Sequence, residues 1–205
     1  VSRSEHEVVT EWDLQKRVKA YLRQYKYVFV LCATTNLDRI FALARAVPRG
    51  KYCICDEYQK TLVKAVSDRW SNLSTFYQMP KLTTYGDNLL PRFQERGGLM
   101  FVRANRQFER ILRQFDPQQS ILLYSMWDGY RTKPDSTIPE FLSLAGTWAE
   151  LHTSGHASPD DLRHVIEKAD PEIVIPMHTD VPQKMQTLCQ NRKVILLKDR
   201  EELLL

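Results

Sequence analysis

Short apolar runs that each lead into a capped helix most constrain the fold of this chain. Residues 27–33, YVFVLCA, are rich in β-branched and aromatic side chains, and the Thr-Thr-Asn that follows can cap a helix with an apolar stripe. Residues 51–55 and 57–70 repeat this pattern of a strand followed by a helix. Strands that alternate with helices predict an α/β fold, in which a parallel sheet is covered by helices on both faces.

The alternation continues along most of the chain, with one interruption. Residues 71–98 have no sustained period of a strand or a helix, and we expect a long irregular excursion there. The further predicted strands are 99–104, 121–127, 148–153, 172–177 and 193–198. Two further helices are predicted to begin near Thr10 and near Asn105, and three more to cover residues 139–144, 159–169 and 181–190. The polar stretch 128–137 is the best predicted boundary, which gives an α/β domain at 1–130 and C-terminal βα units at 131–205.

Composition and charge narrow the class of protein. The net charge of +4 permits an anionic partner such as nucleic acid but does not require one. The longest apolar run has seven residues, so no membrane partner is expected. Four scattered cysteines favour buried free thiols over a disulfide scaffold. The chain has no secretion signal and begins with Val1, so we expect a cytoplasmic protein and a fragment of a longer chain.

Two histidines occupy equivalent places, each after a predicted strand and before a predicted helix. His156 follows the strand that ends at Thr153 and precedes a helix capped by Ser158, and His178 stands at the end of the next strand. Ligands of parallel sheets bind beyond the carboxyl ends of the strands, so we expect both histidines at one edge, within about 10 Å of each other. Imidazole there can bind a metal, transfer a proton or donate to a phosphate oxygen.

Each histidine also has a purely structural interpretation, because a histidine at a strand end commonly caps the chain or completes a hydrogen-bond network. His152 lies four residues before His156, but it is in a strand that enters a loop, so this spacing does not indicate a common face. His164 is expected on the exposed side of its helix and His6 in a charged tail, and neither is assigned a role.

The segment HTSGHASPDDLRHVIEKADPEIVIPMHTD resembles the last two motifs of the β-CASP branch of the metallo-β-lactamase superfamily. This group includes RNase J, the cleavage nuclease of messenger-RNA 3′-end processing and DNA cross-link repair nucleases. In the family, a Ser-Gly-His-Ala-like or Ser-Ala-His-like motif precedes a strand that ends in Pro-x-His, and the spacing of 22 positions from His156 to His178 fits that interval. The resemblance is specific only over residues 148–180, and it implies that the upstream α/β units correspond to the β-CASP insertion.

The resemblance implies a role for each matching residue. His178 is similar to the family's last histidine, a ligand to one of two catalytic metals, usually zinc. His156 resembles the histidine that assists at the scissile phosphate, as an acid or by stabilising charge. His152, Ser154 and Gly155 match positions that can hold a substrate phosphate. The two metals would activate a water for in-line attack and neutralise the leaving oxygen.

The chain departs from the family pattern in its metal ligands. The His-x-His-x-Asp-His run is absent, because the sequence has no histidine between His6 and His152. The following histidine, the bridging aspartate and the acidic residue that opens the β-CASP region also have no match. All of these would precede Val1, so we expect a C-terminal portion whose catalytic metal-binding half is missing. The zinc site is then incomplete in this chain, and we expect it alone to bind metal poorly and to be inactive.

Two other groups of residues can contact nucleic acid. Arginines recur at helical spacing on one face and can track a phosphate backbone, although a solvated face is the commoner outcome; they are Arg106, Arg110 and Arg113. A second group near a predicted strand end consists of Tyr124, Trp127, Tyr130 and Arg131. Its aromatic rings can stack on bases. Tyr124 and Trp127 fit core positions equally well.

These observations support one hypothesis and leave alternatives open. The leading one is a portion of a metal-dependent hydrolase whose intact form cleaves nucleic-acid phosphodiesters, RNA rather than DNA, with zinc as cofactor. Its partners are then nucleic acid and the missing N-terminal half, and self-association stays open. One alternative is a non-catalytic α/β module that binds nucleic acid or a protein. Another is a self-sufficient enzyme that uses His156 and His178 with Asp160 or Asp180, and a small-molecule substrate also stays open.

Overall fold

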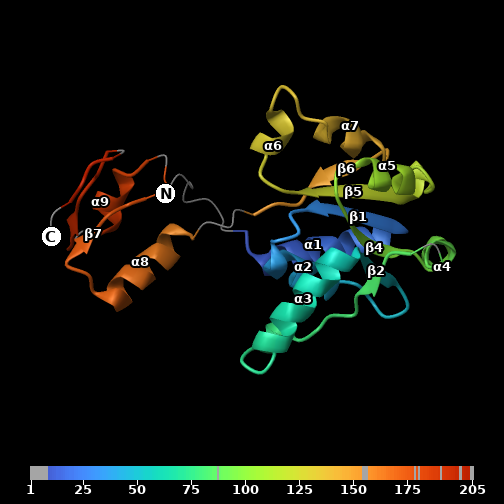
Figure 1. Ribbon diagram of the computed structural model, residues 1–205, viewed down its shortest axis with the longest axis horizontal. Coiled ribbons are helices and arrows are strands. Elements are labelled where there is room, and N and C mark those ends of the chain that lie inside the picture. Colours follow the sequence, from blue (N-terminus) through green and yellow to red (C-terminus); the bar gives the residue numbers. More distant parts are fainter. Residues whose placement is uncertain are drawn as a thin grey trace. The chain divides into compact units, whose positions relative to one another are not determined.

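The computed structural model describes residues 9–86, 88–153, 157–177, 179, 181–189, 191–198 and 200–203. The chain divides into two compact units, a larger one of residues Val9–Thr153 and a smaller one that contains the C-terminal part from residue 154 onward (Figure 1). No helix among these residues has the length and apolar character that crossing a bilayer requires.

The larger unit alternates helices and strands, as the sequence predicts. Its elements in chain order are α1 (Glu11–Gln24), β1 (Tyr27–Cys32), α2 (Leu37–Ala44), β2 (Tyr52–Cys55), α3 (Glu57–Trp70), η1 (Thr75–Tyr77), β3 (Thr83–Thr84), α4 (Leu90–Arg96), β4 (Gly98–Val102), α5 (Arg106–Leu112), η2 (Pro117–Gln119), β5 (Ser120–Ser125), α6 (Gly129–Thr132), α7 (Ile138–Ser143) and β6 (Trp148–Glu150). The first helix begins where the sequence predicts it, because Thr10 and Asp13 form a capping box.

Six parallel strands form one sheet in the order β3-β2-β4-β1-β5-β6. The predicted α/β fold with a parallel sheet is therefore confirmed. The central strand β1 pairs Tyr27 with Gly98 of β4 on one side and with Ser120 of β5 on the other. The edge strand β6 pairs Trp148 with Leu122 of β5, so the sheet continues past the predicted boundary at 128–137 and the larger unit extends to residue 153.

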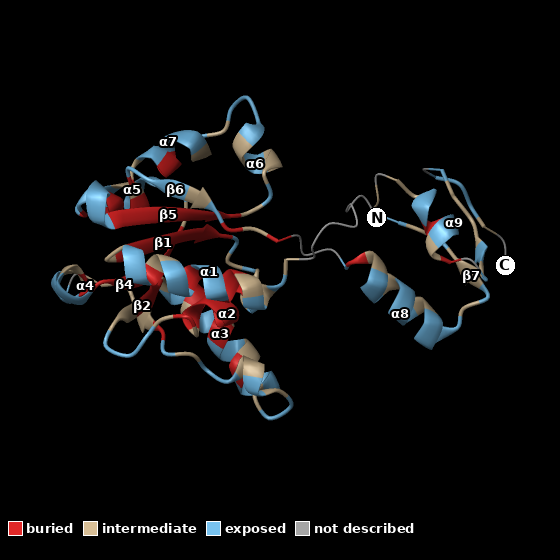
Figure 2. Ribbon diagram, turned by 180° about the vertical axis from the view of Figure 1, so that it is seen from behind, coloured by how far each residue is buried: buried red, intermediate tan, exposed pale blue. Residues whose placement is uncertain are grey.

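Helices cover both faces of this sheet, and each face has its own apolar core (Figure 2). On one face α1, α2 and α3 pack against residues that include Val28 and Val30 of β1. On the other face α4, α5 and α7 pack against Phe29 and Leu31 of the same strand. Successive residues of β1 point to opposite faces and all six are buried, which explains why the run beginning at residue 27 is continuously apolar.

Two consecutive glycines allow β4 to lie between β1 and β2. A Cβ on Gly97, with φ +68°, would lie 2.2 Å from the Lys26 carbonyl oxygen, and one on Gly98, with φ +143°, would lie 2.0 Å from the Tyr52 carbonyl oxygen. The backbone N–H of Gly98 donates to the Lys26 oxygen at 2.9 Å, and that of Tyr52 donates to the Gly97 oxygen at 3.0 Å. Only glycine leaves room for these close backbone contacts.

The predicted excursion at 71–98 is largely irregular, but it also supplies the edge strand β3 and the helix α4. One side chain at the end of α2, that of Arg45, fixes the first part of this excursion. Arg45 Nη2 donates to the carbonyl oxygens of Thr75, Phe76 and Gln78 at 3.0, 2.6 and 2.9 Å. These three hydrogen bonds anchor the η1 segment to the end of α2.

The smaller unit consists of α8 (Pro159–Ala169), β7 (Ile173–Val174), α9 (Lys184–Leu188) and β8 (Lys193–Val194), with β7 and β8 parallel. The helix α8 begins as predicted, with a capping box between Ser158 and Asp161 and with Pro159 in its first turn. Its apolar stripe is only partly covered, because Leu162 and Ile166 are half-buried and Val165 is 61% exposed. The described part of this unit therefore has much less core than the larger unit.

Candidate functional site at the carboxyl edge of the sheet

The carboxyl edge of the six-stranded sheet contains a point where neighbouring connections diverge. The strand β1 leads into α2, which packs on one face, whereas its neighbour β5 leads toward α7, which packs on the other. In parallel α/β sheets, ligands bind in the crevice that such a divergence creates. Arg39 of α2 reaches across this point to Ser125, the last residue of β5.

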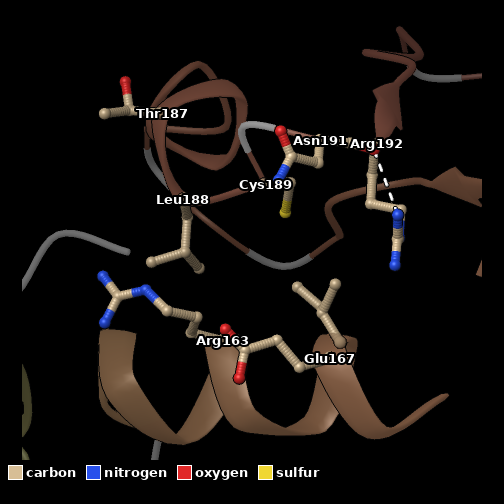
Figure 3. A pocket seen from close by; sticks show the side chains of 8 residues that line it. Arg163, Glu167, Thr187, Leu188, Cys189, Asn191 and Arg192 are labelled. Carbon is tan, nitrogen blue, oxygen red and sulfur yellow. Dashed lines mark hydrogen bonds between the residues drawn. The ribbon is translucent and has the colours of Figure 1, made fainter. Parts of the chain in front are cut away.

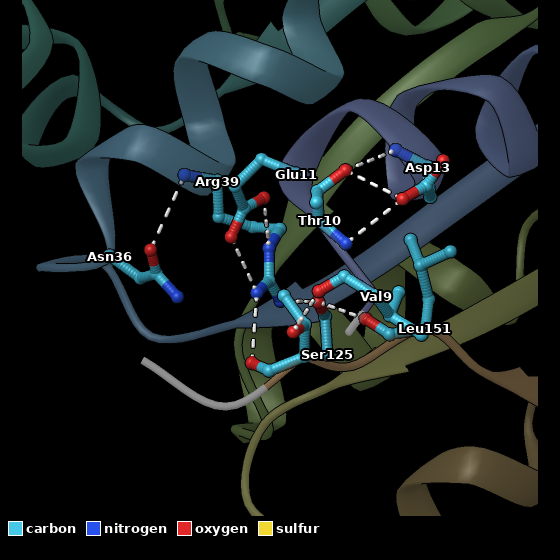
Figure 4. A network of polar contacts seen from close by, with 9 residues as sticks. Val9, Thr10, Glu11, Asp13, Asn36, Arg39, Ser125 and Leu151 are labelled. Atoms are coloured by element: carbon cyan, nitrogen blue, oxygen red, sulfur yellow. Dashed lines mark hydrogen bonds and ion pairs between the residues drawn. The ribbon is translucent and has the colours of Figure 1, made fainter. Parts of the chain in front are cut away.

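Arg39 is the centre of a buried polar network (Figure 4). Its Nε and Nη2 atoms donate to the two carboxylate oxygens of Glu11 at 2.7 and 2.8 Å. Its Nη1 donates to Ser125 Oγ at 2.5 Å, and Nη2 also donates to the Thr153 carbonyl oxygen at 3.2 Å. The Arg39 side chain is 1% exposed and that of Glu11 is 28% exposed. A two-point pair of this kind balances the buried charge and fixes the relative positions of α1, α2 and β5.

Helix capping explains why Arg39 and Glu11 meet at this edge. Asn36 caps α2, and its Oδ1 accepts from the Arg39 N–H at 3.3 Å, so Arg39 lies in the first turn of the helix. Glu11 lies in the first turn of α1, where the helix dipole favours a negative charge. Both helices begin at the carboxyl edge, so their first turns bring the two charged side chains together.

The two ends of the larger unit also meet here. Thr153 Oγ1 donates to the Val9 carbonyl oxygen at 2.5 Å. Ser125 Oγ, which accepts from Arg39, donates to the Leu151 carbonyl oxygen at 2.5 Å. The chain therefore enters and leaves this unit at neighbouring positions, and the Arg39 network holds both.

His152 is a predicted phosphate-binding residue that the structure places at this edge. Its side chain is half-buried, and Nδ1 is buried with no hydrogen-bond partner among the described residues. Burial lowers the pKa of the imidazole and the Arg39 guanidinium lowers it further, whereas the Glu150 carboxylate and a hydrogen bond with the Ser125 backbone oppose these effects. A neutral imidazole has a single N–H donor, so His152 can contact a phosphate oxygen only through the donor for which the Ser125 backbone also competes.

The other predicted site residues lie outside the described residues. These are Ser154, Gly155, His156 and His178. The expected closeness of the two histidines therefore stays a prediction. The described residues next to them show that α8 begins with its predicted cap at Ser158, and that Met177, which precedes His178, is 82% exposed.

The described residues by themselves do not fit a metal centre. They contain no group of three or more His, Cys, Asp or Glu side chains that could hold an ion. The four cysteines are free and buried, as predicted. Cys32 ends β1 near Arg39, and burial raises the pKa of its thiol to about 12 although Arg39 opposes this. A thiol that stays protonated at neutral pH is neither a ready metal ligand nor a nucleophile.

The aromatic group predicted near the end of β5 divides into buried and exposed members. Tyr124 is a core residue, and its hydroxyl donates to the Trp127 carbonyl oxygen at 2.7 Å. Trp127 and Tyr130 are 60% and 49% exposed, and their rings meet edge-on with centroids 5.4 Å apart. Arg131 lies over the ring of Trp148, at 5.4 Å from its centroid. The exposed rings can stack on a base, but Arg131 is already engaged with the Trp148 ring and with the Asp128 carboxylate.

Sequence reasoning missed Arg39, Glu11 and Ser125. The capping residue Asn36 could have located Arg39 in the first turn of α2, but a charged residue there is ordinarily solvated. Its burial depends on β5, whose last residue Ser125 is 86 positions away in the sequence. Trp148 was also missed as a member of the aromatic group, because it belongs to a different strand.

Two cavities lie in the smaller unit. One, of about 260 Å³, separates α8 from α9 and is lined by both charged and apolar side chains, including Arg163, Glu167 and Leu188 (Figure 3). The other, of about 400 Å³, is lined by Met177 and Thr179, the residues on either side of the predicted metal ligand His178.

No protein-family model matches the chain, and no curated protein matches it.

Proposed function

We propose that this chain is a portion of a metal-dependent hydrolase of the β-CASP metallo-β-lactamase type, whose intact form cleaves the phosphodiester bonds of nucleic acid. RNA is the proposed substrate rather than DNA, and the cytoplasm is the proposed compartment. The assignment combines the resemblance of residues 148–180 with the construction of the larger unit.

The hydrogen bond between Thr153 and Val9 carries the most weight. An α/β unit that is inserted into another domain must begin and end at neighbouring positions, because the host chain enters and resumes there. The larger unit meets this requirement, since Thr153 Oγ1 and the Val9 oxygen are 2.5 Å apart. His152 and Thr153 are also the first residues of the motif that resembles the β-CASP family. The motif therefore starts where the proposed insertion ends.

The small apolar core in the described part of the smaller unit supports the same proposal. The apolar stripe of α8 includes Leu162, Val165 and Ile166, and none of them is fully buried. Two-residue strands such as β7 and β8 do not form a stable sheet without further partners. These features agree with a unit that completes its core with a portion of the protein not included in this sequence.

The residue roles are proposals that follow from the resemblance. His178 would be one metal ligand, His156 would act at the scissile phosphate, and His152, Ser154 and Gly155 would contact a substrate phosphate. The metals of such a centre would supply an activated water and would stabilise the negative charge that develops on the leaving oxygen. The described residues contribute position: the Arg39 network fixes the end of the larger unit, and His152 lies next to it, where a substrate phosphate would compete with the Ser125 backbone for the imidazole N–H.

A single assay separates this proposal from a non-catalytic nucleic-acid-binding or protein-binding module. The intact protein is incubated with zinc and a 5′-phosphorylated single-stranded RNA, and in parallel with DNA of the same sequence. The proposal predicts cleavage of the RNA that a chelator abolishes and added zinc restores. Binding of RNA without any turnover, or turnover that is insensitive to the chelator, contradicts a metal-dependent hydrolase. Faster cleavage of the DNA contradicts the choice of RNA.

A further inference from the structure

A strongly basic surface covers the helices α4 and α5. Residues 92–113 contain six arginines and two glutamates, a net charge of +4 that equals the net charge of the whole chain. The arginines are Arg92, Arg96, Arg103, Arg106, Arg110 and Arg113. The excess positive charge of the protein is therefore concentrated in one short segment, and the rest of the chain is neutral on balance.

Five of these arginines are exposed and form no ion pair with another described residue. Arg103 is half-buried and pairs with Asp56 at 2.6 Å. None of the other five forms an ion pair with any residue in the part of the chain that the structure describes. Other arginines of the chain do pair, as Arg39 does with Glu11 and Arg163 with Asp160. The guanidinium groups on α4 and α5 thus keep their binding capacity for an external anion.

The basic side chains of α5 form one outward-facing row. Arg106, Arg110 and Arg113 recur at intervals of four and three residues, which places them on one face of a helix. The opposite face of α5 is apolar and packs into the core of the sheet, through Phe108 and Ile111. The three arginines therefore face outward, because turning them toward the sheet would take Phe108 and Ile111 out of the core.

The helix α4 extends this surface. The rings of Phe93 and Phe115 lie 5.5 Å apart, and Gln94 Nε2 donates to the Gln114 carbonyl oxygen at 3.2 Å, so α4 contacts the segment that directly follows α5. Arg92 and Arg96 lie one helical turn apart on α4 and are exposed. Figures 1 and 2 show both helices on the larger unit. The basic surface therefore spans two helices of one compact unit.

We infer that this surface, defined by Arg92, Arg96, Arg106, Arg110 and Arg113, binds the phosphodiester backbone of single-stranded RNA. Exposed guanidinium forks match phosphate oxygens in shape and charge, and several in a row can follow one strand. The inference deepens the proposed function and rests on it for the choice of RNA among polyanions. The surface belongs to α4, α5 and the residues next to them, and it shares no residue with the Arg39 network.

The binding should be independent of base sequence and strongly dependent on salt. Each arginine that neutralises a phosphate releases counterions, and the slope of log affinity against log salt changes by roughly 0.7 for each contact with a single strand. Loss of the three contacts from α5 should therefore make the slope about 2 less steep.

The test uses the intact protein with its metal removed by a chelator, so that binding is measured without cleavage. A labelled single-stranded homopolymer RNA is titrated at several salt concentrations with wild type and with Arg106→Gln/Arg110→Gln/Arg113→Gln. The control is Lys16→Gln/Lys19→Gln/Arg23→Gln, which removes the same charge from exposed positions of α1, on the opposite face of the sheet. We expect the first variant to lose about tenfold or more in affinity with the smaller slope, and the control to change by less than about twofold.

Equal losses in the two variants would show that overall charge governs binding, and would overturn the inference. So would an unchanged affinity of the α5 variant, or competition by poly-glutamate as effective as that by RNA at equal charge. If the α5 variant binds normally while the intact protein cleaves RNA, the inference fails and the proposed function stands. If arginine-dependent binding occurs without any cleavage, the surface stands and the proposed function fails.

Discussion

Arg39 and Glu11 form a two-point ion pair between the first turns of two helices, with Nε and Nη2 at 2.7 and 2.8 Å from the carboxylate oxygens. The same guanidinium donates to Ser125 at the end of β5 and to the carbonyl oxygen of Thr153 at the end of the larger unit. One buried cation therefore ties the sheet edge to the position where the proposed catalytic motif begins.

Removing the carboxylate of this pair should be costly. In Glu11→Ala, a guanidinium that is 1% exposed loses its counter-charge, so we expect a loss of about 3–5 kcal/mol in the free energy of unfolding. Glu57→Ala is a matched control. Glu57 is the first residue of α3, just as Glu11 is the first residue of α1, but the Glu57 side chain is exposed. It should lose only the helix-dipole contribution, about 0.3–1 kcal/mol. Urea denaturation measures both, and equal losses would refute the role of the pair.

The pH dependence of stability should contain a contribution from His152. Its pKa in the folded protein lies below the ordinary value of 6.5, mainly because of burial, so the folded state binds fewer protons than the unfolded state. This contribution is complete above pH 6.5 and is lost as the pH falls from there toward the lowered pKa. In His152→Gln, urea midpoints at pH 7.5 and 5.5 should differ less than in wild type.

A second loss of stability should follow at lower pH. The Thr10 hydroxyl and backbone N–H lower the pKa of Asp13 to about 2 from 3.8, so its contribution is present above pH 3.8 and disappears below. Asp13→Asn should remove this loss of stability below pH 3.8 without affecting the loss near pH 6 that comes from His152. A variant of either residue that alters both ranges would contradict the assignment.

Much of the fold could be predicted because it depends on local patterns. The capping boxes at Thr10 and Ser158 and the continuous apolar run of β1 depend on residues close in sequence, and each was placed correctly. The sheet order was not accessible in this way, since it depends on which strands pair. The pairing of Trp148 with Leu122 shows this, because it extends the larger unit beyond the polar stretch that looked like a boundary.

The candidate site could be predicted only in its motif residues. The sequence pointed to His152 because of its place in the motif, but the Arg39 network depends on contacts across 28, 86 and 114 positions. A pattern of residues that are close in the sequence does not indicate contacts over such distances. The Thr153 to Val9 hydrogen bond, which best supports the insertion, spans 144 positions and was equally inaccessible.

The glycine pair before β4 gives a prediction about the sheet itself. In Gly98→Ala, the new Cβ would meet the Tyr52 carbonyl oxygen at 2.0 Å, so β4 must shift and stability should fall by about 2–4 kcal/mol. Gly86→Ala is the control, because a Cβ there meets nothing within 4 Å, and its effect should be within about 0.5 kcal/mol. Thermal unfolding compares them, and a harmless Gly98→Ala would contradict the packing of β4 between β1 and β2.

The two units should differ in their ability to fold alone. Residues 9–153 contain two apolar cores and have adjacent ends, so we expect them to fold as an isolated domain with a cooperative thermal transition. Residues 154–205 have little core among the described residues and should show no such transition. Circular dichroism of the two excised pieces makes the comparison. A cooperative transition in the smaller piece would contradict its proposed dependence on a missing half.

The most direct test of the proposed function is the metal content of the intact protein, measured together with single-turnover cleavage of a 5′-phosphorylated RNA, in His178→Ala and His156→Ala. The account predicts that His178→Ala loses metal as well as rate, because a ligand is removed. It predicts that His156→Ala keeps its metal and loses about 10²- to 10⁴-fold in rate, because a group that assists at the scissile phosphate is removed. His164→Ala, at an exposed position of α8, should change neither. Full activity in both variants, or loss of metal in His156→Ala but not in His178→Ala, would contradict the account.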